Sequence, residues 1–267
     1  MFEIFESRRT ITGKIVATTA LHIGAAQDEF SPNGEKNAFM RDASGQPIIP
    51  GSSLKGVMRS FLESILAGKT PQNKDERPPC SLTRMCIEPN DDQYKTIARE
   101  STRSSEKEKE LAEHIQKNTC VICRLFGSQV NGAKFMIRDA FVMPTTFTQE
   151  FERRTGVSMD RDLRKAAEHH VFPFEIVPEN TAFAFEAIVE NANETEWQCV
   201  CIVLKAMEKG LLSLGGMTSR GLGSVQLKDC EVSQMDQANL LNILLNGENA
   251  EKRPLADYMP TGGIPYV

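Results

Sequence analysis

Seven apolar residues between positions 54 and 66 recur at the spacing of one helix face, and no other feature constrains the fold as strongly. They lie at i, i+3, i+4, i+7, i+8, i+11 and i+12, which predicts an amphipathic helix with one buried stripe. We expect Ser52 or Ser53 to cap its start and Gly68 to end it. The stripe consists of Leu54, Val57, Met58, Phe61, Leu62, Ile65 and Leu66.

A strand, an amphipathic helix and a second strand follow one another twice along the chain. Strands are expected at 11–23, 135–142, 172–177, 182–190 and 225–232, and the second helix at 194–214. The strands at 172–177 and 182–190 are expected to form a hairpin across the Pro178-Glu179-Asn180 turn. This order predicts an α+β fold with a modified ferredoxin-like (RNA-recognition-motif-like) sheet, covered by helices on one face and open on the other.

Two loops rich in small residues adjoin helix ends and carry basic side chains. Pro50-Gly51-Ser52-Ser53-Leu54-Lys55-Gly56 leads into the first helix, where backbone N–H groups and the positive end of the helix dipole favour a phosphate. Lys55 and Arg59 lie four residues apart and share one helix face. The loop at 215–223 holds four glycines together with Ser219 and Arg220. The alternative is a capped helix with solvated charges and a loop that only turns the chain.

The charge and hydropathy of the chain exclude some classes of function. A net charge of −5, with 31 basic residues, argues against a protein that coats nucleic acid with its whole surface, but it allows one basic groove. The chain has no long apolar run and its first ten residues do not resemble a secretory signal, so we expect no membrane partner and a cytoplasmic location.

Four of the seven cysteines, Cys80, Cys86, Cys120 and Cys123, fall in a polar stretch at 69–134 that resembles an insertion. Four thiolates suit tetrahedral zinc, and the Cys-x2-Cys pair is a familiar half-site. A structural zinc would hold together a segment with little core of its own. Four free thiols are the alternative, as is His114 in place of Cys80. We expect the other three cysteines to be packing residues.

Taken in order, several blocks of the sequence resemble the RAMP superfamily, and more narrowly the repeating backbone subunits of type III CRISPR complexes. These blocks are Leu21-His22-Ile23-Gly24, Pro47 to Gly56, Leu125-Phe126-Gly127, Arg138-Asp139-Ala140, Gly215-Gly216 and Ser219 to Gly223. The resemblance implies a single domain over residues 1–267, with a palm, a zinc-knot insertion at 69–134 and a thumb hairpin at 145–170.

The same resemblance implies that the chain binds CRISPR guide RNA, with complementary target RNA and other RAMP subunits as further partners. The thumb would insert between guide and target, using arginines at 153, 154, 161 and 164. The implied RNA-binding residues are Gly51, Ser52, Ser53, Lys55, Arg59, Gly215, Gly216, Ser219 and Arg220.

Whether the chain cuts target RNA is left open by the residues of the first loop. The resemblance implies a metal-dependent aspartate six residues before Asp42, but Lys36 stands there and cannot act as an anionic base. Asp28, earlier in the same loop, is the candidate catalytic residue, with Mg or another divalent metal as its cofactor. The alternatives are a stand-alone RNA-processing endoribonuclease that uses His22, His169 or His170, and a zinc-stabilised scaffold without catalytic activity.

Overall fold

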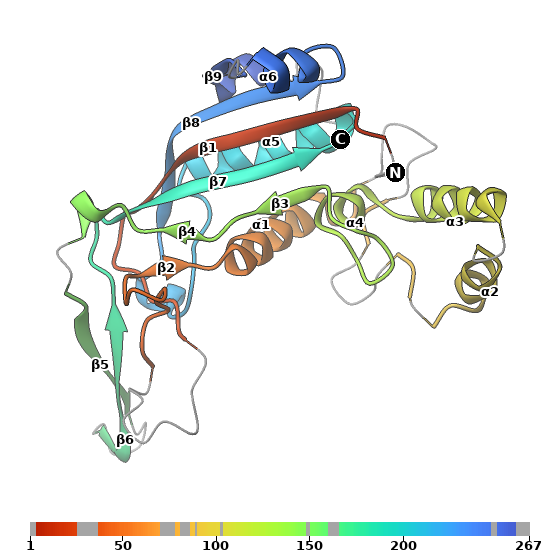
Figure 1. The fold of residues 1–267 in the computed structure, drawn as a ribbon. Coiled ribbons are helices and arrows are strands. Elements are labelled where there is room, and N and C mark those ends of the chain that lie inside the picture. Colours follow the sequence, from red (N-terminus) through yellow and green to blue (C-terminus); the bar gives the residue numbers. More distant parts are fainter. Residues whose placement is uncertain are drawn as a thin grey trace.

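The computed structural model describes residues 4–25, 37–69, 78–80, 86–88, 90–101, 104–147, 150–159, 166–246 and 250–259. Its centre is a five-stranded antiparallel sheet with the strand order β3-β7-β1-β8-β9 (Figure 1). The strands are β1 (Ser7–Ala17), β3 (Phe135–Ile137), β7 (Ala182–Glu190), β8 (Val225–Asp236) and β9 (Lys252–Pro254). The chain is therefore a mixed α/β protein built on an antiparallel sheet.

Alternation of side chains along β1 gives the sheet one buried and one open face. Ile11 and Ile15 are fully buried, and Ile11 lies opposite Ala187 on β7 and Val232 on β8. Lys14, which points to the other face, is exposed. Because a shift of one residue would exchange the two faces, the buried isoleucines fix the register of the central strands.

Helices α1 (Gly51–Leu66) and α5 (Glu194–Glu208) lie against the sheet and confirm both predicted amphipathic helices, except that α5 ends at Glu208 and not at residue 214. The predicted serine cap of α1 is wrong: Pro50 is the N-cap, and the Gly51 N–H donates to Asp139 Oδ1 at 2.7 Å. Gly68 has φ +74°, the left-handed conformation expected at the end of the helix. Helix α5 begins with a capping box between Asn193 and Glu196.

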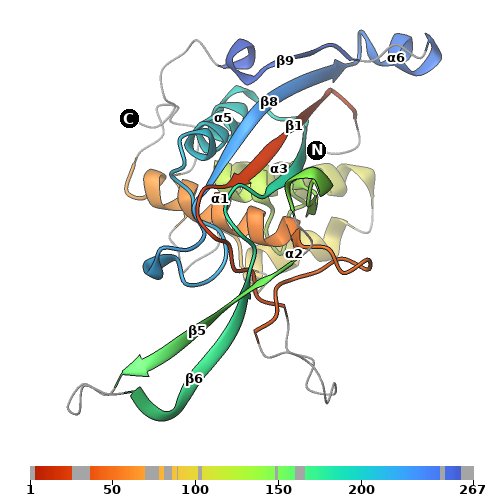
Figure 2. The same cartoon turned by 90° about the vertical axis from the view of Figure 1, so that its left-hand side faces the viewer.

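A two-stranded hairpin, β5 (Glu152–Met159) and β6 (Ala166–Ile176), projects from the sheet and its helices (Figure 2). The predicted pairing of 172–177 with 182–190 is wrong, because β6 pairs with β5 while β7 pairs with β1 and β3. The Pro178-Glu179-Asn180 turn does connect β6 to β7, but the two strands separate into different sheets. Phe172 lies opposite Gly156, where a Cβ would come within 2.3 Å of the ring.

Three helices follow α1 in the stretch predicted to be an insertion: α2 (Asp92–Ser101), α3 (Ser105–Asn118) and α4 (Val121–Phe126). Helices α2 and α3 pack on each other, away from the sheet (Figure 1). All six residues of α4 are buried, and α4 contacts both α1 and α5. The short elements are β2 (Ile48–Ile49), β4 (Ala140–Phe141), α6 (Leu240–Asn246), η1 (Pro144–Thr146), η2 (Thr218–Arg220) and η3 (Leu255–Tyr258).

Within the described ranges, no helix combines the length and the apolar composition that crossing a membrane requires.

Candidate functional site

The start of α1 is held by a close approach between Gly51 and the segment after β3. Gly51 is buried, and a Cβ there would lie 2.4 Å from the Ile137 carbonyl oxygen, so only glycine fits. Its N–H is occupied by Asp139. Ser52 is exposed and Ser53 is half-buried. The outward-facing groups at this helix start are therefore the two serines and their backbone, while Gly51 positions them.

Lys55 and Arg59 share a face of α1 but have different surroundings. Among the described residues, Lys55 has no ion-pair partner, and burial together with the nearby Arg59 charge lowers the pKa of its ammonium group. Arg59 Nε lies 2.8 Å from Glu63 Oε1, and Arg59 Nη1 donates to the Gly127 carbonyl at 2.9 Å. Lys55 is thus available to an anion, whereas Arg59 already joins α1 to the end of α4.

The glycine-rich loop after α5 packs closely against His22, in the segment that follows β1. Gly215 has φ +78°, and a Cβ there would lie 2.0 Å from the His22 carbonyl oxygen, which receives the Gly216 N–H at 2.9 Å. This contact exposes η2, with Ser219 and Arg220, to solvent. The Arg220 guanidinium lies 5.9 Å from the Phe172 ring of β6. The loop therefore presents an exposed cation beside the hairpin.

Both small-residue loops attach to one ladder of short backbone pairings. The Gly216 N–H bonds to His22, the Met40 N–H bonds to the Ile23 carbonyl at 2.8 Å, and the Ile48 N–H bonds to the Met40 carbonyl at 3.1 Å. Ile48 belongs to β2, which leads directly into α1. The ladder lies at the end of the sheet from which β5–β6 projects (Figure 1). The start of α1, which carries Lys55, and the glycine loop, which carries Arg220, are thus connected through the same short stretch of backbone.

His22, a candidate base in the stand-alone nuclease alternative, is buried within this ladder. Its Nδ1–H donates to the Glu175 carbonyl, with 2.6 Å between the heavy atoms, and its ring meets Phe174 edge-on at 5.4 Å. Its role in the structure is to connect β6 to the end of β1.

The open face of the sheet, which the sequence leaves free for RNA, carries three ion pairs. They are Arg8–Glu190, Lys14–Asp229 and Arg138–Glu186. Each pair neutralises a cation that would otherwise attract phosphate. Lys55 and Arg220, which have no ion-pair partner among the described residues, are therefore better placed to bind an anion than these three cations.

The four predicted cysteine ligands lie together, and their sulfur atoms all fall within 4.8 Å of one another. Cys80 Sγ is 3.6 Å from Cys123 Sγ and 3.7 Å from Cys120 Sγ. Tetrahedral zinc with bonds of about 2.3 Å separates its sulfur ligands by about 3.8 Å, so these spacings fit that ion. Hydrogen bonds among the four thiols lower the pKa of Cys120 and raise the pKa values of Cys80 and Cys86, so a metal that binds all four sulfur atoms would displace protons from the cluster.

A buried charge network joins the cysteine cluster to the helix layer. Glu196 on α5 is fully buried and bonds to Arg124 Nε at 2.8 Å and Lys134 Nζ at 2.7 Å. Arg124 lies on α4, one residue after Cys123, and also donates to the Thr119 carbonyl at 3.0 Å. The cluster is therefore coupled to α5 through Glu196. Cys199, Cys201 and Cys230 are buried, as expected of packing residues.

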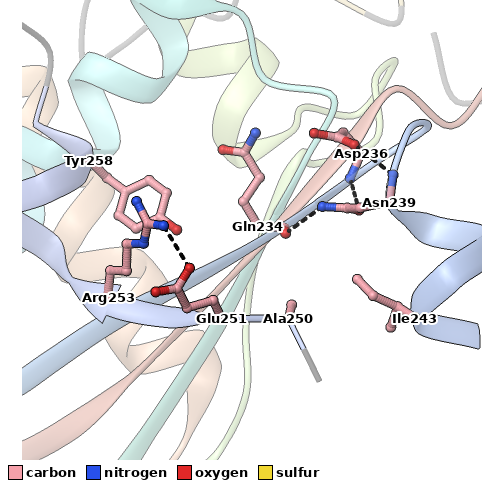
Figure 3. A pocket seen from close by; sticks show the side chains of 8 residues that line it. All are labelled: Gln234, Asp236, Asn239, Ile243, Ala250, Glu251, Arg253 and Tyr258. Atoms are coloured by element: carbon pink, nitrogen blue, oxygen red, sulfur yellow. Dashed lines mark hydrogen bonds and ion pairs between the residues drawn. The ribbon is translucent and has the colours of Figure 1, made fainter. Parts of the chain in front are cut away.

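A separate hollow of about 390 Å³ lies near the other end of β8 (Figure 3). Its polar groups largely satisfy one another: Arg253 pairs with Glu251, and Asn239 bonds to the Gln234 carbonyl and to the Asp236 N–H. None of the predicted site residues lines this hollow. We assign it no ligand.

Asp28 and Lys36 lie outside the described residues, as do Arg161 and Arg164, and the side chains of His169 and His170 are likewise not described. Sequence reasoning missed the roles of Asp139 at the start of α1 and of Glu175 and Glu196 as buried carboxylates. Glu175 had one usable signal, since it is a single acidic residue within the otherwise apolar segment at 171–177.

The helix start at Gly51, the glycine loop and parts of the antiparallel sheet lie within the part of the chain that matches a known protein superfamily. The chain matches the RAMP superfamily over residues 14–226 and belongs to it.

Its relatives within this superfamily carry CRISPR names. The chain is 26% identical to the CRISPR system Cms endoribonuclease Csm3 of Methanothermobacter thermautotrophicus, covering 86% of this chain and 87% of that protein. It is 27% identical to the protein of the same name from Enterococcus italicus, over 88% of this chain and 98% of that protein. A shorter match, 37% identical over 70 residues, links it to the CRISPR system Cms protein Csm5 of Streptococcus thermophilus, covering 26% of this chain and 18% of that protein.

Proposed function

We propose that this protein is a guide-RNA-binding backbone subunit of a type III CRISPR interference complex, and that it works beside other RAMP subunits in the cytoplasm. The observation that carries the proposal is that the start of α1 and the glycine loop attach to one backbone ladder, and that each carries a cation with no ion-pair partner among the described residues. Similarity to Csm3 proteins along most of the chain supports the same assignment.

In this proposal the guide backbone lies along the two loops. Ser52, Ser53 and Ser219 donate hydrogen bonds to phosphate oxygens, and Lys55 and Arg220 supply positive charge. Gly215 and Gly216 allow the chain to approach the RNA closely, while Gly51 fixes the helix start. Arg59 contributes charge from the same face of α1, but its bonds to Glu63 and Gly127 reduce its share.

The palm of the proposal is ferredoxin-like. Two features support this assignment: the strand order is β3-β7-β1-β8, and α1 connects β1 to β3 while α5 connects β7 to β8. Two such βαβ units in one antiparallel sheet are the pattern of the ferredoxin-like fold. The hairpin β5–β6, with exposed Arg153 and Arg154, is the thumb that reaches between guide and complementary target RNA. The predicted thumb at 145–170 overlaps this hairpin but ends within β6.

Structural zinc on the four cysteines completes the proposal. When bound, zinc would cross-link the start of α4 to the stretch between α1 and α2. Cys120 and Cys123 at the start of α4, with Cys80 and Cys86 from that stretch, would hold it. The ion pair between Glu196 and Arg124 then holds α4 in a fixed position relative to α5.

Cleavage of target RNA is the catalytic part of the proposal, with Asp28 as the candidate residue. The Csm3 relatives are named endoribonucleases, which supports it. Mg or another divalent ion would stabilise charge on the scissile phosphate. Burial of His22, whose Nδ1–H is already engaged, speaks against the stand-alone nuclease that would use it as a base.

Purification from the native host tests the proposal as a whole. A complex that carries RNA of a defined length, together with other RAMP subunits, is the expected result. An RNA-free monomer that hydrolyses RNA would support a stand-alone processing enzyme instead. An RNA-free, inactive oligomer would support a zinc-stabilised scaffold.

A further inference from the structure

Arg59 lies on α1 one turn after Lys55, and two contacts inside the protein fix its guanidinium group. Its Nε lies 2.8 Å from Glu63 Oε1, and its Nη1 donates to the Gly127 carbonyl at 2.9 Å. The side chain of Arg59 is 28% exposed and that of Glu63 is 12% exposed. The guanidinium is therefore held between α1 and the end of α4.

The helix that Arg59 reaches is the one that carries two of the four clustered cysteines. Gly127 is the C-cap of α4, a helix of six residues that are all buried. Cys120 is the N-cap of the same helix, and Cys123 lies in its first turn. Because six residues make fewer than two helical turns, the contact with Arg59 and the cysteine site are close neighbours along α4.

Charge also acts directly between Arg59 and the cysteines. Burial acts to lower the pKa of Arg59, but the Glu63 carboxylate and the negative charges of Cys123 and Cys80 raise it overall. Arg59 therefore supplies a positive charge from α1 that is felt at the cysteine site.

This charge matters most when the site holds a metal. Four thiolates around a zinc ion leave a double negative charge, and Cys120 and Cys123 are fully buried. Charges interact more strongly across partly dry protein than across water, so a nearby cation stabilises the loaded site. Arg124 also adjoins the site, but it is paired with the buried Glu196.

The two partners of the Arg59–Glu63 ion pair have opposite effects on such a site. The pair is neutral as a whole, so loss of the Arg59 charge alone leaves the Glu63 carboxylate near the negatively charged cluster. Loss of the Glu63 charge alone leaves the Arg59 cation there instead. The first change disfavours the metal-bound form, and the second does not.

We propose that Arg59 is a positioning residue of the four-cysteine site, which stabilises the metal-bound form by its charge and by holding the end of α4 against α1. The inference rests on the proposed zinc site. It assigns Arg59 no bond to the metal; Arg59 acts through Gly127 and through its electrostatic effect on the sulfur atoms.

The test measures the zinc affinity of the purified chain by competition with a chromophoric chelator. Arg59→Gln removes the charge and leaves Glu63 without its partner. Loss of an outer-shell partner typically weakens metal binding by about 10- to 100-fold, and we expect a loss in that range. Glu63→Gln keeps an oxygen that can accept from Arg59 but removes the negative charge, so it should bind zinc at least as tightly as the wild type.

Three further variants separate electrostatics from folding. Arg59→Lys keeps the charge without the planar guanidinium and should recover most of the lost affinity. Arg8→Gln removes an arginine from its ion pair with Glu190 on the open face of the sheet and should leave zinc affinity within twofold. Val232→Ala creates a cavity in the buried face of the sheet and lowers the Tm, so it shows how much affinity is lost through reduced stability alone.

Wild-type affinity in Arg59→Gln would overturn the inference, as would a loss no larger than that of Val232→Ala at the same decrease in Tm. Weaker zinc binding by Glu63→Gln would also overturn it, because a purely structural contact loses affinity whichever partner is changed. This second variant decides the matter even if Arg59→Gln does not fold. A wild-type chain without bound metal would refute the zinc site and the inference together, whereas a wild type that binds one equivalent of zinc confines any failure to Arg59.

Discussion

Replacing Lys55 and Arg220 with alanine removes one cation from the start of α1 and one from the glycine loop, neither of which has an ion-pair partner among the described residues. A cation already paired with a carboxylate gains little by meeting a phosphate, because one ion pair is exchanged for another. An unpaired cation neutralises the phosphate and releases its condensed counterions, which makes binding depend on salt. The double variant should therefore lower both the affinity for guide RNA and its dependence on salt.

The size of the effect follows from the number of contacts. For single-stranded nucleic acid, each neutralised phosphate contributes about 0.7 to the slope of log affinity against log salt. Two lost contacts should reduce the slope by about 1.4. At 0.1 M salt each contact contributes about 0.7 log unit, so the double variant should bind about 25-fold more weakly.

Filter binding of the purified chain to a labelled guide RNA, at four or five salt concentrations, measures both quantities. Lys14→Ala is the matched control, because Lys14 is paired with Asp229 at 2.9 Å on the open face of the sheet. It should leave the slope unchanged. An unaltered slope in the double variant would refute the assignment of the loops, and a reduced slope in the control would move the RNA to the open face.

Three other predictions concern the fold, the metal and the chemistry. Glu196→Gln leaves Arg124 and Lys134 without their buried partner and should lower the free energy of unfolding by about 3–5 kcal/mol in urea titrations; an unchanged midpoint would contradict the network. Cys120→Ser should abolish binding of one equivalent of zinc in elemental analysis and lower the Tm, whereas a wild-type protein without metal would end the zinc proposal. Asp28→Ala should stop target cutting and spare guide binding, and undiminished cutting would transfer the catalytic role to another residue.

The helices were predictable because the spacing that indicates a helix is visible within a short stretch of sequence. Apolar residues recur at helical spacing over 54–66, and α1 forms there. The hairpin between 172–177 and 182–190 failed because alternation shows that a segment is a strand but not which strand it pairs with. The sequence predicts that the two segments on either side of the Pro178-Glu179-Asn180 turn pair with each other. In the structure, β7 pairs with β1 on one side and with β3 on the other.

The candidate site likewise contains residues that local spacing predicts and residues that it does not. The cysteine cluster was predictable because its ligands are all of one residue type and two of them are three positions apart. Asp139 and Glu175 were missed because their partners are distant in sequence: 88 residues separate Asp139 from Gly51, and 134 separate Glu175 from Arg41. Spacing along the chain gives no information about a carboxylate whose partner is distant in sequence and is brought close only by the fold.

The two outer strands of the sheet are only three residues long, and β9 ends on Pro254, which lacks an N–H. A foreign strand that adds to either outer strand would find no more than three residues to pair with. In the proposed complex, copies of the chain that lie side by side along a guide RNA would have little outer strand through which to join their sheets. Contacts between such copies would then rely on side chains, which can separate without pulling a strand out of the sheet.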